Sequence, residues 1–165
     1  MAHCYLANFQ STPQYNYNNK EMVQKNQMTA DFEQLTYTAK LLKDSWEDKH
    51  TYFKLFASHG TVDHGMTDFI SWIIQTNHSE RLFAGSSMYR LLISKPKNGK
   101  LNYQQTLSIS FDKPTGLYTM QYSDWDTIDH EKDYKDAIQW KSKCTGIELA
   151  ARFLEFLEWN KSWNQ

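Results

Sequence analysis

Apolar residues recur at helical spacing over residues 32–46. Successive members of the pattern are three, four, three and four residues apart, which places them on one side of an α-helix. These residues are Phe32, Leu35, Ala39, Leu42 and Trp46. Phe53 and Phe56 continue the pattern, and Gly60 is a typical helix-ending residue. The pattern predicts either one bent helix or two helices that are broken near Asp48.

A second helix is predicted from Thr67 to about Asn77. Thr67 is a good N-cap residue, and Asp68 would lie beside the positive end of the helix dipole. The residues expected on its buried side are Phe69, Ile70, Ile73 and Ile74.

The apolar pattern then changes to a period of two, which is typical of strands with one buried face. Three stretches show it, and their apolar members are Tyr89, Leu91 and Ile93, then Leu107, Ile109 and Phe111, then Tyr118, Met120 and Tyr122. Asn98-Gly99 is a strong signal for a two-residue hairpin turn, and residues 112–116 form a second turn signal. Ile138 and Trp140 suggest a fourth, short strand. The sequence therefore predicts an antiparallel meander of three to four strands.

The last helix begins with a capping box, because Thr145 is followed three residues later by Glu148. The apolar stripe expected after it consists of Ile147, Ala150, Leu154 and Leu157, widened by Phe153 and Phe156. Such a helix would cover the apolar face of the sheet. We therefore expect a single α+β domain over residues 1–165, with N-terminal helices, the meander and a C-terminal helix packed on the sheet. Residues 1–28 are rich in Asn and Gln, and we expect an irregular arm there, with one short strand at residues 3–9.

Composition narrows the function class. The 165 residues are 40% hydrophobic and 22% charged, which excludes a disordered or collagen-like chain. Apolar runs extend over only a few residues, so we expect no membrane span. A net charge of −1 argues against a protein that mainly binds nucleic-acid phosphates. The beginning of the sequence has no secretory signal pattern, so we expect a cytoplasmic protein. Cys4 and Cys144 would then be reduced thiols, although one long-range disulfide is the alternative.

Acidic charge is concentrated in residues 124–136. Six acidic side chains stand against two lysines there, a local net charge of −4. Acidic residues mixed with exposed aromatic residues suit a docking surface for a basic protein, and a connector that only meets solvent is the alternative. The residues expected to bind a partner are Asp124, Trp125, Asp126, Asp129, Glu131, Asp133 and Tyr134. The segment fails as a calcium loop, since Ile128, Asp129 and Lys135 occupy the fifth, sixth and twelfth positions.

Two other places could carry chemistry. His59, Asp63 and His64 lie in one predicted loop, and two histidines with a carboxylate can bind zinc or transfer protons. Their spacing is not that of a helical HExxH site, and a polar loop whose aspartate caps the next turn is the alternative. Cys144 directly precedes the capped helix, whose dipole could activate the thiol as a nucleophile. A buried structural cysteine is the interpretation that we prefer.

The predicted meander from Tyr89 to Tyr122, the acidic stretch from Asp124 to Asp136 and the capped helix from Thr145 together resemble the small immunity proteins of bacterial toxin–immunity systems. This resemblance implies a cytoplasmic, non-catalytic inhibitor without a cofactor, whose acidic, aromatic surface blocks a basic toxin domain. One alternative is a small metal-dependent hydrolase that uses His59, Asp63 and His64. Another is a domain that binds a small ligand in an apolar pocket lined by Tyr118, Met120 and Tyr122.

Overall fold

The computed structural model describes residues 17–127 and 133–164 of the chain, which divides into two compact units, Met1–Tyr37 and Thr38–Gln165. The described residues of the first unit, 17–37, belong to helix α1 (Tyr17–Ser58). Where their side chains are described, at positions 24, 25 and 27–29, they are exposed. The irregular arm expected over residues 1–28 is therefore wrong for residues 17–28, and the strand expected at residues 3–9 lies outside the described residues.

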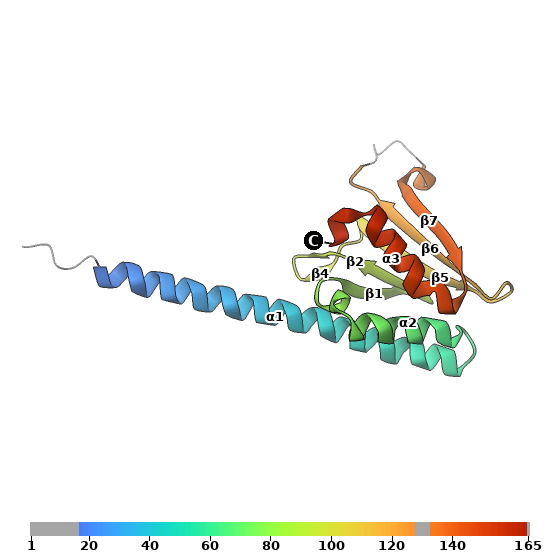
Figure 1. The fold of residues 1–165 in the computed structure, drawn as a ribbon, viewed down its shortest axis with the longest axis horizontal. Helices are drawn as coiled ribbons and strands as arrows, with labels where there is room; N and C mark the ends of the chain where they lie inside the picture. Colours follow the sequence, from blue (N-terminus) through green and yellow to red (C-terminus); the bar gives the residue numbers. More distant parts are fainter. Residues whose placement is uncertain (1–16, 128–132, 165) are drawn as a thin grey trace, which may run out of the picture. The chain divides into compact units, whose positions relative to one another are not determined.

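The second unit contains a five-stranded antiparallel sheet (Figure 1). Its strands are β1 (Phe83–Ser87), β2 (Arg90–Ser94), β5 (Gln105–Asp112), β6 (Leu117–Asp124) and β7 (Ile138–Cys144). They lie in the order β1-β2-β5-β6-β7, so each strand pairs with its predecessor in the meander. The predicted α+β fold is confirmed, with more strands than expected. The sequence of β1, FAGSS, lacks the alternation that identifies a half-buried strand, which is why it was missed.

The predicted Asn98-Gly99 turn is confirmed. It joins β3 (Pro96–Lys97) to β4 (Lys100–Leu101), which form a small separate sheet. Asn98 and Gly99 have φ angles of 54° and 68°, as a two-residue hairpin of this kind requires.

Helix α1 continues through Asp48 without a break, so the single-helix alternative is correct. Leu42, Trp46 and Phe53 are buried as predicted, whereas Ala39 is exposed. The side chains of Phe32 and Leu35 lie outside the described set. The buried positions follow the helical period, and Asp48 falls on the exposed side, so nothing in the pattern interrupts the helix.

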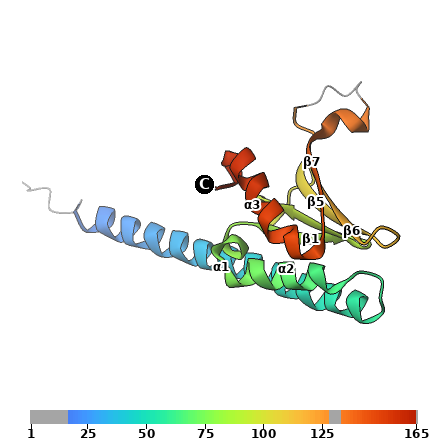
Figure 2. The same ribbon diagram turned by 45° about the vertical axis from the view of Figure 1, so that its right-hand side comes forward.

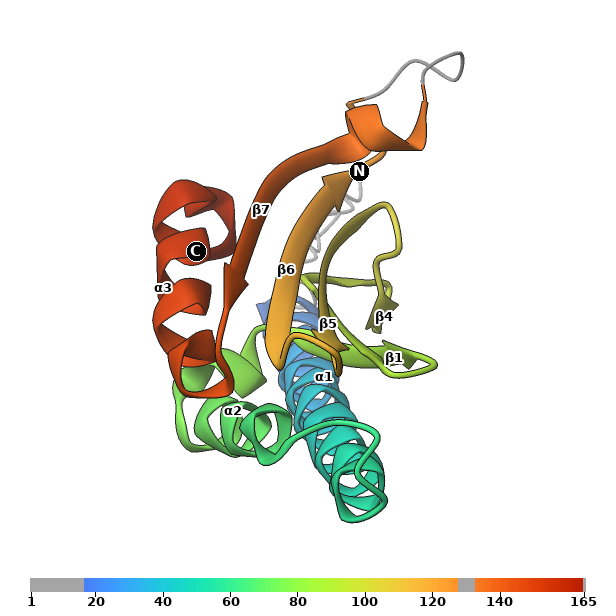
Figure 3. The ribbon, with the colours of Figure 1, turned by 90° about the vertical axis from the view of Figure 1, so that its right-hand side faces the viewer.

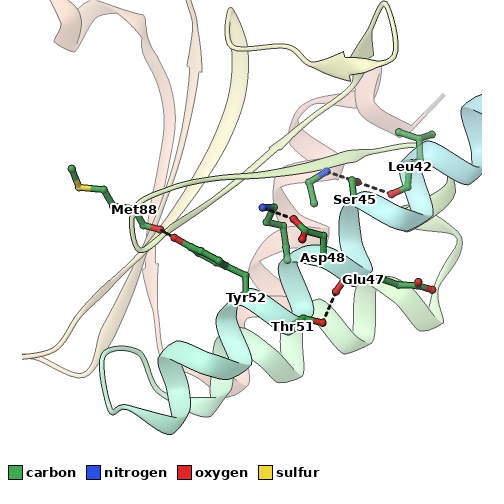
Figure 4. Close-up of polar contacts among 9 residues, drawn as sticks. Leu42, Ser45, Glu47, Asp48, Thr51, Tyr52 and Met88 are labelled. Carbon is green, nitrogen blue, oxygen red and sulfur yellow. Dashed lines mark hydrogen bonds and ion pairs between the residues drawn. The ribbon is translucent and has the colours of Figure 1, made fainter.

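Three hydrogen bonds connect α1 with the chain around β1. The Trp46 indole N–H donates to the carbonyl oxygen of Leu82 at 2.7 Å. The Ser45 hydroxyl accepts the Ala84 N–H at 3.1 Å, and the Tyr52 hydroxyl donates to the carbonyl oxygen of Met88 at 2.9 Å (Figure 4). The Trp46 bond is buried, and a buried polar group is costly unless it is paired, so this bond above all fixes the position of the helix along the strand.

Helix α2 (His64–Gln75) begins earlier than predicted and is followed by the short helix η1 (Asn77–Glu80). Asp63, not Thr67, is the N-cap, and its Oδ1 accepts the N–H of Gly65 at 2.8 Å. Thr67 is buried inside the helix, and its hydroxyl donates to the carbonyl oxygen of His64. Both residues are good caps by type, and the one that comes first satisfies the free amides of the first turn.

The predicted C-terminal helix is confirmed as η3 (Gly146–Glu148) followed by α3 (Leu149–Trp159), and η4 (Lys161–Asn164) follows it. The backbone N–H and the hydroxyl of Thr145 both donate to Glu148 Oε2, at 2.9 and 2.8 Å. The predicted stripe is partly wrong, because Ile147 is 94% exposed and Leu154 is 44% exposed. A 3₁₀ turn advances by fewer residues per turn than an α-helix, so the first turn points Ile147 away from the core. The buried side consists of Leu149, Phe153, Phe156 and Leu157.

The first turns of α2 and of the C-terminal helical segment touch through two glycines. A Cβ atom built on Gly65 would lie 2.5 Å from the Cα of Gly146, and one built on Gly146 would lie 2.9 Å from the Cα of Gly65. Real side chains do not approach a backbone so closely, so both positions require glycine.

The core lies between one face of the sheet and the helices. Every second residue of β6 points into it, namely Tyr118, Met120, Tyr122 and Asp124. Helix α3 runs beside β7 (Figure 3), and its aromatic side chains contact those of the sheet, as in the pair Tyr122 and Phe156, whose ring centroids are 5.3 Å apart. The opposite face of β6 carries Leu117, Thr119, Gln121 and Ser123, which are half-buried. None of the described helices is long and apolar enough to cross a membrane.

We expect Thr145→Ala to lower the melting temperature by about 3 °C, because the capping hydroxyl is lost. Thr51→Ala is the matched control, since Thr51 is an exposed threonine inside α1 whose hydroxyl bonds only to the carbonyl oxygen of Glu47 in the same helix. Differential scanning calorimetry measures both. Equal melting temperatures for the two variants would contradict a stabilising role for the capping box.

The loss of melting temperature caused by Thr145→Ala should be smaller in acid than at neutral pH. The hydrogen bond from the Thr145 backbone lowers the pKa of Glu148 below its ordinary value of 4.5, and the bond from the Thr145 hydroxyl lowers it further. Only the hydroxyl bond is lost in Thr145→Ala. A carboxyl group whose pKa is lowered by folding stabilises the fold above its unfolded pKa, and the contribution is lost as the pH falls through the folded pKa.

Candidate functional site

The acidic segment, residues 124–136, joins β6 to β7 at the end of the sheet that is remote from α2 (Figure 2). Asp126 is exposed, and Trp125 is 37% exposed. Asp133 is exposed and precedes η2 (Tyr134–Ala137), and Asp136 is exposed within it. Asp129 and Glu131 lie outside the described residues, as does the side chain of Tyr134. The described acids of the segment, apart from Asp124, are thus open to solvent.

Asp124 does not lie on the exposed loop where the sequence analysis placed it. It is the last residue of β6 and only 7% exposed. Its Oδ1 accepts the N–H of Asp126 at 3.0 Å, and its Oδ2 accepts the side-chain amide of Gln105 at 3.2 Å and the hydroxyl of Tyr122 at 3.5 Å. Asp124 lies two residues after Tyr122, in the same alternating row as Tyr118 and Met120. The alternation of the strand could therefore have predicted an inward side chain.

A small cavity opens beside Asp124. Its volume is about 180 Å³, and it is lined by Gln105, Tyr122, Asp124, Gln139, Trp159, Asn160 and Ser162. These residues come from β5, β6, β7, the end of α3 and η4, so the cavity joins the sheet to the C-terminal part of the chain. No local sequence motif could have predicted the cavity. The alternation of β6 was the sole signal, and only for Asp124. We call it the Asp124 cavity.

Gln139 reaches the Asp124 cavity because of an irregularity in β7. Tyr122 pairs with Trp140 and Ser123 pairs with Ile138, so Gln139 is an extra residue opposite this step. Such a bulge redirects a side chain that regular pairing would send to the other face. The side-chain amide of Gln139 donates to the Thr127 hydroxyl at 2.6 Å, which connects the cavity wall to the beginning of the acidic segment.

Tyr122 and Trp159 form the aromatic side of the Asp124 cavity. Their ring centroids are 5.9 Å apart in an edge-to-face arrangement, and Trp159 is 48% exposed. Burial raises the pKa of the Tyr122 hydroxyl, and the charge of Asp124 raises it further. The hydroxyl donates a long hydrogen bond of 3.5 Å to the carboxylate.

The residues His59, Asp63 and His64 do not form a metal site. His59 and His64 are exposed, whereas Asp63 is half-buried and caps α2. The Asp63 Oδ1 accepts both the Gly65 N–H and the hydroxyl of Tyr118, so its role is to join α2 to β6. Within the described part of the chain, no group of three His, Cys, Asp or Glu residues could hold a metal ion. The alternative of a capping aspartate in a polar loop is the one that the structure supports.

A larger cavity of about 440 Å³ adjoins this loop, between the start of α2 and the C-terminal helix. Its lining consists of Asp63, His64, Gly65, Asp68, Phe69, Trp72, Gly146, Ile147 and Ala150. The cavity could not be predicted from the sequence, since its walls come from two helices about 80 residues apart. Its one partly buried carboxylate, that of Asp63, already accepts two hydrogen bonds, and the other titratable residues of the lining, His64 and Asp68, are exposed.

Cys144 and the predicted apolar pocket both belong to the core. Cys144 is 3% exposed, and burial raises the pKa of its thiol to about 11, which opposes a role as a thiolate nucleophile. Cys4, its possible disulfide partner, lies outside the described residues. Tyr118, Met120 and Tyr122 are at most 3% exposed and pack against other core side chains. They do not line an apolar pocket, and Tyr122 contributes to the polar Asp124 cavity instead.

Tyr118→Phe should destabilise the fold by about 1–3 kcal/mol, since a buried hydrogen-bonding group loses its partner. The Tyr118 hydroxyl accepts the Met66 N–H at 3.1 Å and donates to Asp63. Tyr103→Phe serves as the control, because Tyr103 is 67% exposed. Urea unfolding gives both free energies, and a Tyr118→Phe variant as stable as the control would refute this role.

In a Cys4→Ser background, the thiol of Cys144 should react slowly with a disulfide reagent at neutral pH and rapidly after unfolding in urea. The reason is that its buried position excludes the reagent and its raised pKa keeps it protonated. Absorbance of the released thiolate follows the reaction. Fast modification of the native protein would contradict the buried position.

The comparisons with known proteins give no relative. No protein-family model, curated protein or solved structure matches the chain. Any function assigned to the chain therefore depends on its own residues and their arrangement.

Proposed function

We propose that the chain is a cytoplasmic, non-catalytic protein-binding domain, an immunity-type inhibitor that occludes a basic toxin domain. The observation that carries this proposal is the acidic segment, in which Asp126, Asp133 and Asp136 are exposed and Trp125, next to Asp126 in the chain, is partly exposed. The local net charge of −4 contrasts with −1 for the whole chain, so negative charge is gathered on one connection of the fold.

The acids and the aromatic ring would play different parts in binding. Exposed acids attract a basic partner over several ångströms and speed its approach, but each contributes little to final affinity. A Trp ring that becomes buried on contact supplies anchor area. The acidic segment lies at an end of the sheet, where a partner can reach it without disturbing the core (Figure 2).

The geometry supports binding over the catalytic alternative. The Asp63 carboxylate is occupied by its cap and by Tyr118, so His59 and His64 lack a free carboxylate partner in the loop. The concentration of acid also favours a protein partner over nucleic acid, because phosphates would be repelled from this segment.

The test is a pull-down from the source organism's lysate with a charge-reversed bait, Asp126→Lys with Asp133→Lys. The control bait, Glu47→Lys with Glu80→Lys, changes the net charge equally at exposed positions outside the segment. We expect the wild type and the control to retain one stoichiometric basic protein at low salt, and the segment variant to retain at least about tenfold less.

The inhibitor part of the proposal is tested by expressing the retained protein with and without this chain. We expect growth arrest without the chain, rescue with the wild type and weaker rescue with the segment variant. Equal retention by all three baits, or a retained protein that is harmless when expressed alone, would contradict the proposal.

A further inference from the structure

The Asp124 cavity contains a buried carboxylate whose described hydrogen-bond donors are all neutral groups. The side chain is 7% exposed, and its three donors are a side-chain amide, a hydroxyl and a backbone N–H. No Lys, Arg or His among the described residues forms an ion pair with it. A carboxylate removed from water is costly without a charged partner, and neutral donors offset only part of the cost. The carboxylate therefore favours a cation in the cavity.

The other walls suit an organic cation. Trp159, which is 48% exposed, contributes an accessible aromatic ring to the lining, and such rings attract cations through their quadrupoles. Gln105, Gln139, Asn160 and Ser162 place amide and hydroxyl groups around the same space, and these groups contribute oxygen acceptors. Carboxylate, aromatic face and several acceptors together match a flat, multiply donating cation better than a compact ammonium group.

The size of the cavity restricts the occupant. At about 180 Å³ it is smaller than the roughly 300–1,000 Å³ typical of sites for small organic ligands, so it accommodates one side-chain head group. A calcium site normally gathers six to eight oxygen ligands, several of them from carboxylates, whereas the cavity has a single carboxylate.

We propose that the Asp124 cavity binds the guanidinium group of an arginine side chain presented by the protein partner. The identity of the partner rests on the proposed function, and the cation specificity of the cavity does not. Asp126 links the Asp124 cavity to the acidic segment. Its backbone N–H donates to the Asp124 carboxylate, while its side chain belongs to the exposed part of the segment. An arginine attracted by that segment would thus find the buried carboxylate immediately behind it.

The experiment is an NMR titration of the full chain with ethylguanidinium, without any partner protein. N-Ethylurea is the matched probe, since it has nearly the same shape but no charge. We expect ethylguanidinium to shift the side-chain amide signals of Gln105 and Gln139 and the indole signal of Trp159, and N-ethylurea to leave them unchanged. Equal shifts with both probes, or a response only to calcium or magnesium chloride, would overturn the proposal.

Three variants locate the binding. Asp124→Asn keeps the shape of the side chain and should weaken ethylguanidinium binding at least about tenfold. Asp126→Asn removes an exposed charge from the adjacent residue and should weaken it less than twofold, because exposed pairs contribute little. A loss as large as that of Asp124→Asn would mean general attraction to an acidic surface and would overturn the proposal.

Gln139→Glu should strengthen binding, a result that misfolding cannot produce. It adds a second carboxylate at an exposed position in the cavity wall. Failure of this gain, in a variant with an unchanged melting temperature, would contradict the cavity as the cation site. Ethylguanidinium binding with no protein partner in the lysate would support the Asp124 cavity as a guanidinium site and would refute the immunity function. Partner binding without any ethylguanidinium response would refute the cavity as the cation site and would leave the immunity function supported.

Discussion

Strand β6 connects the start of α2 with the Asp124 cavity, because its inward-facing residues reach both places. Its inward row begins at Tyr118, whose hydroxyl bonds the start of α2, and ends at Asp124, whose carboxylate lines the small polar cavity. Between them, Met120 and Tyr122 fill the core under α3. A shift of one residue would reverse every one of these side chains, so the cavity and the helix junction depend on the same pairing of β6 with β5 and β7.

Periodicity in the sequence predicted the elements whose burial follows a regular pattern. Residues 118–122 alternate and form a strand, and Leu42 and Trp46 share a helical face and are buried. Prediction failed where two positions could satisfy the same rule, as for Asp63 and Thr67, which are both good N-cap residues. It also failed where geometry departs from the ideal period, since the 3₁₀ turn at the start of the last helix leaves Ile147 outside the core.

The candidate site was only partly accessible from the sequence, for a physical reason. A concentration of charge is visible in the chain itself, so the acidic segment could be identified directly. The Asp124 cavity depends on long-range pairing and on one irregularity in β7, and neither leaves a local pattern. Asp124 shows the difference clearly, because its charge suggested the surface while its position in the strand determined a buried side chain.

The contact between Gly65 and Gly146 links two positions that are remote in the sequence. Neither can accept even a methyl group unless the two backbones separate, so replacing one glycine does not relieve the demand on the other. The pair is therefore a shared evolutionary constraint, in which each residue restricts what selection can tolerate at its counterpart. Variation among descendants of this chain should accumulate in exposed turns long before it reaches this junction.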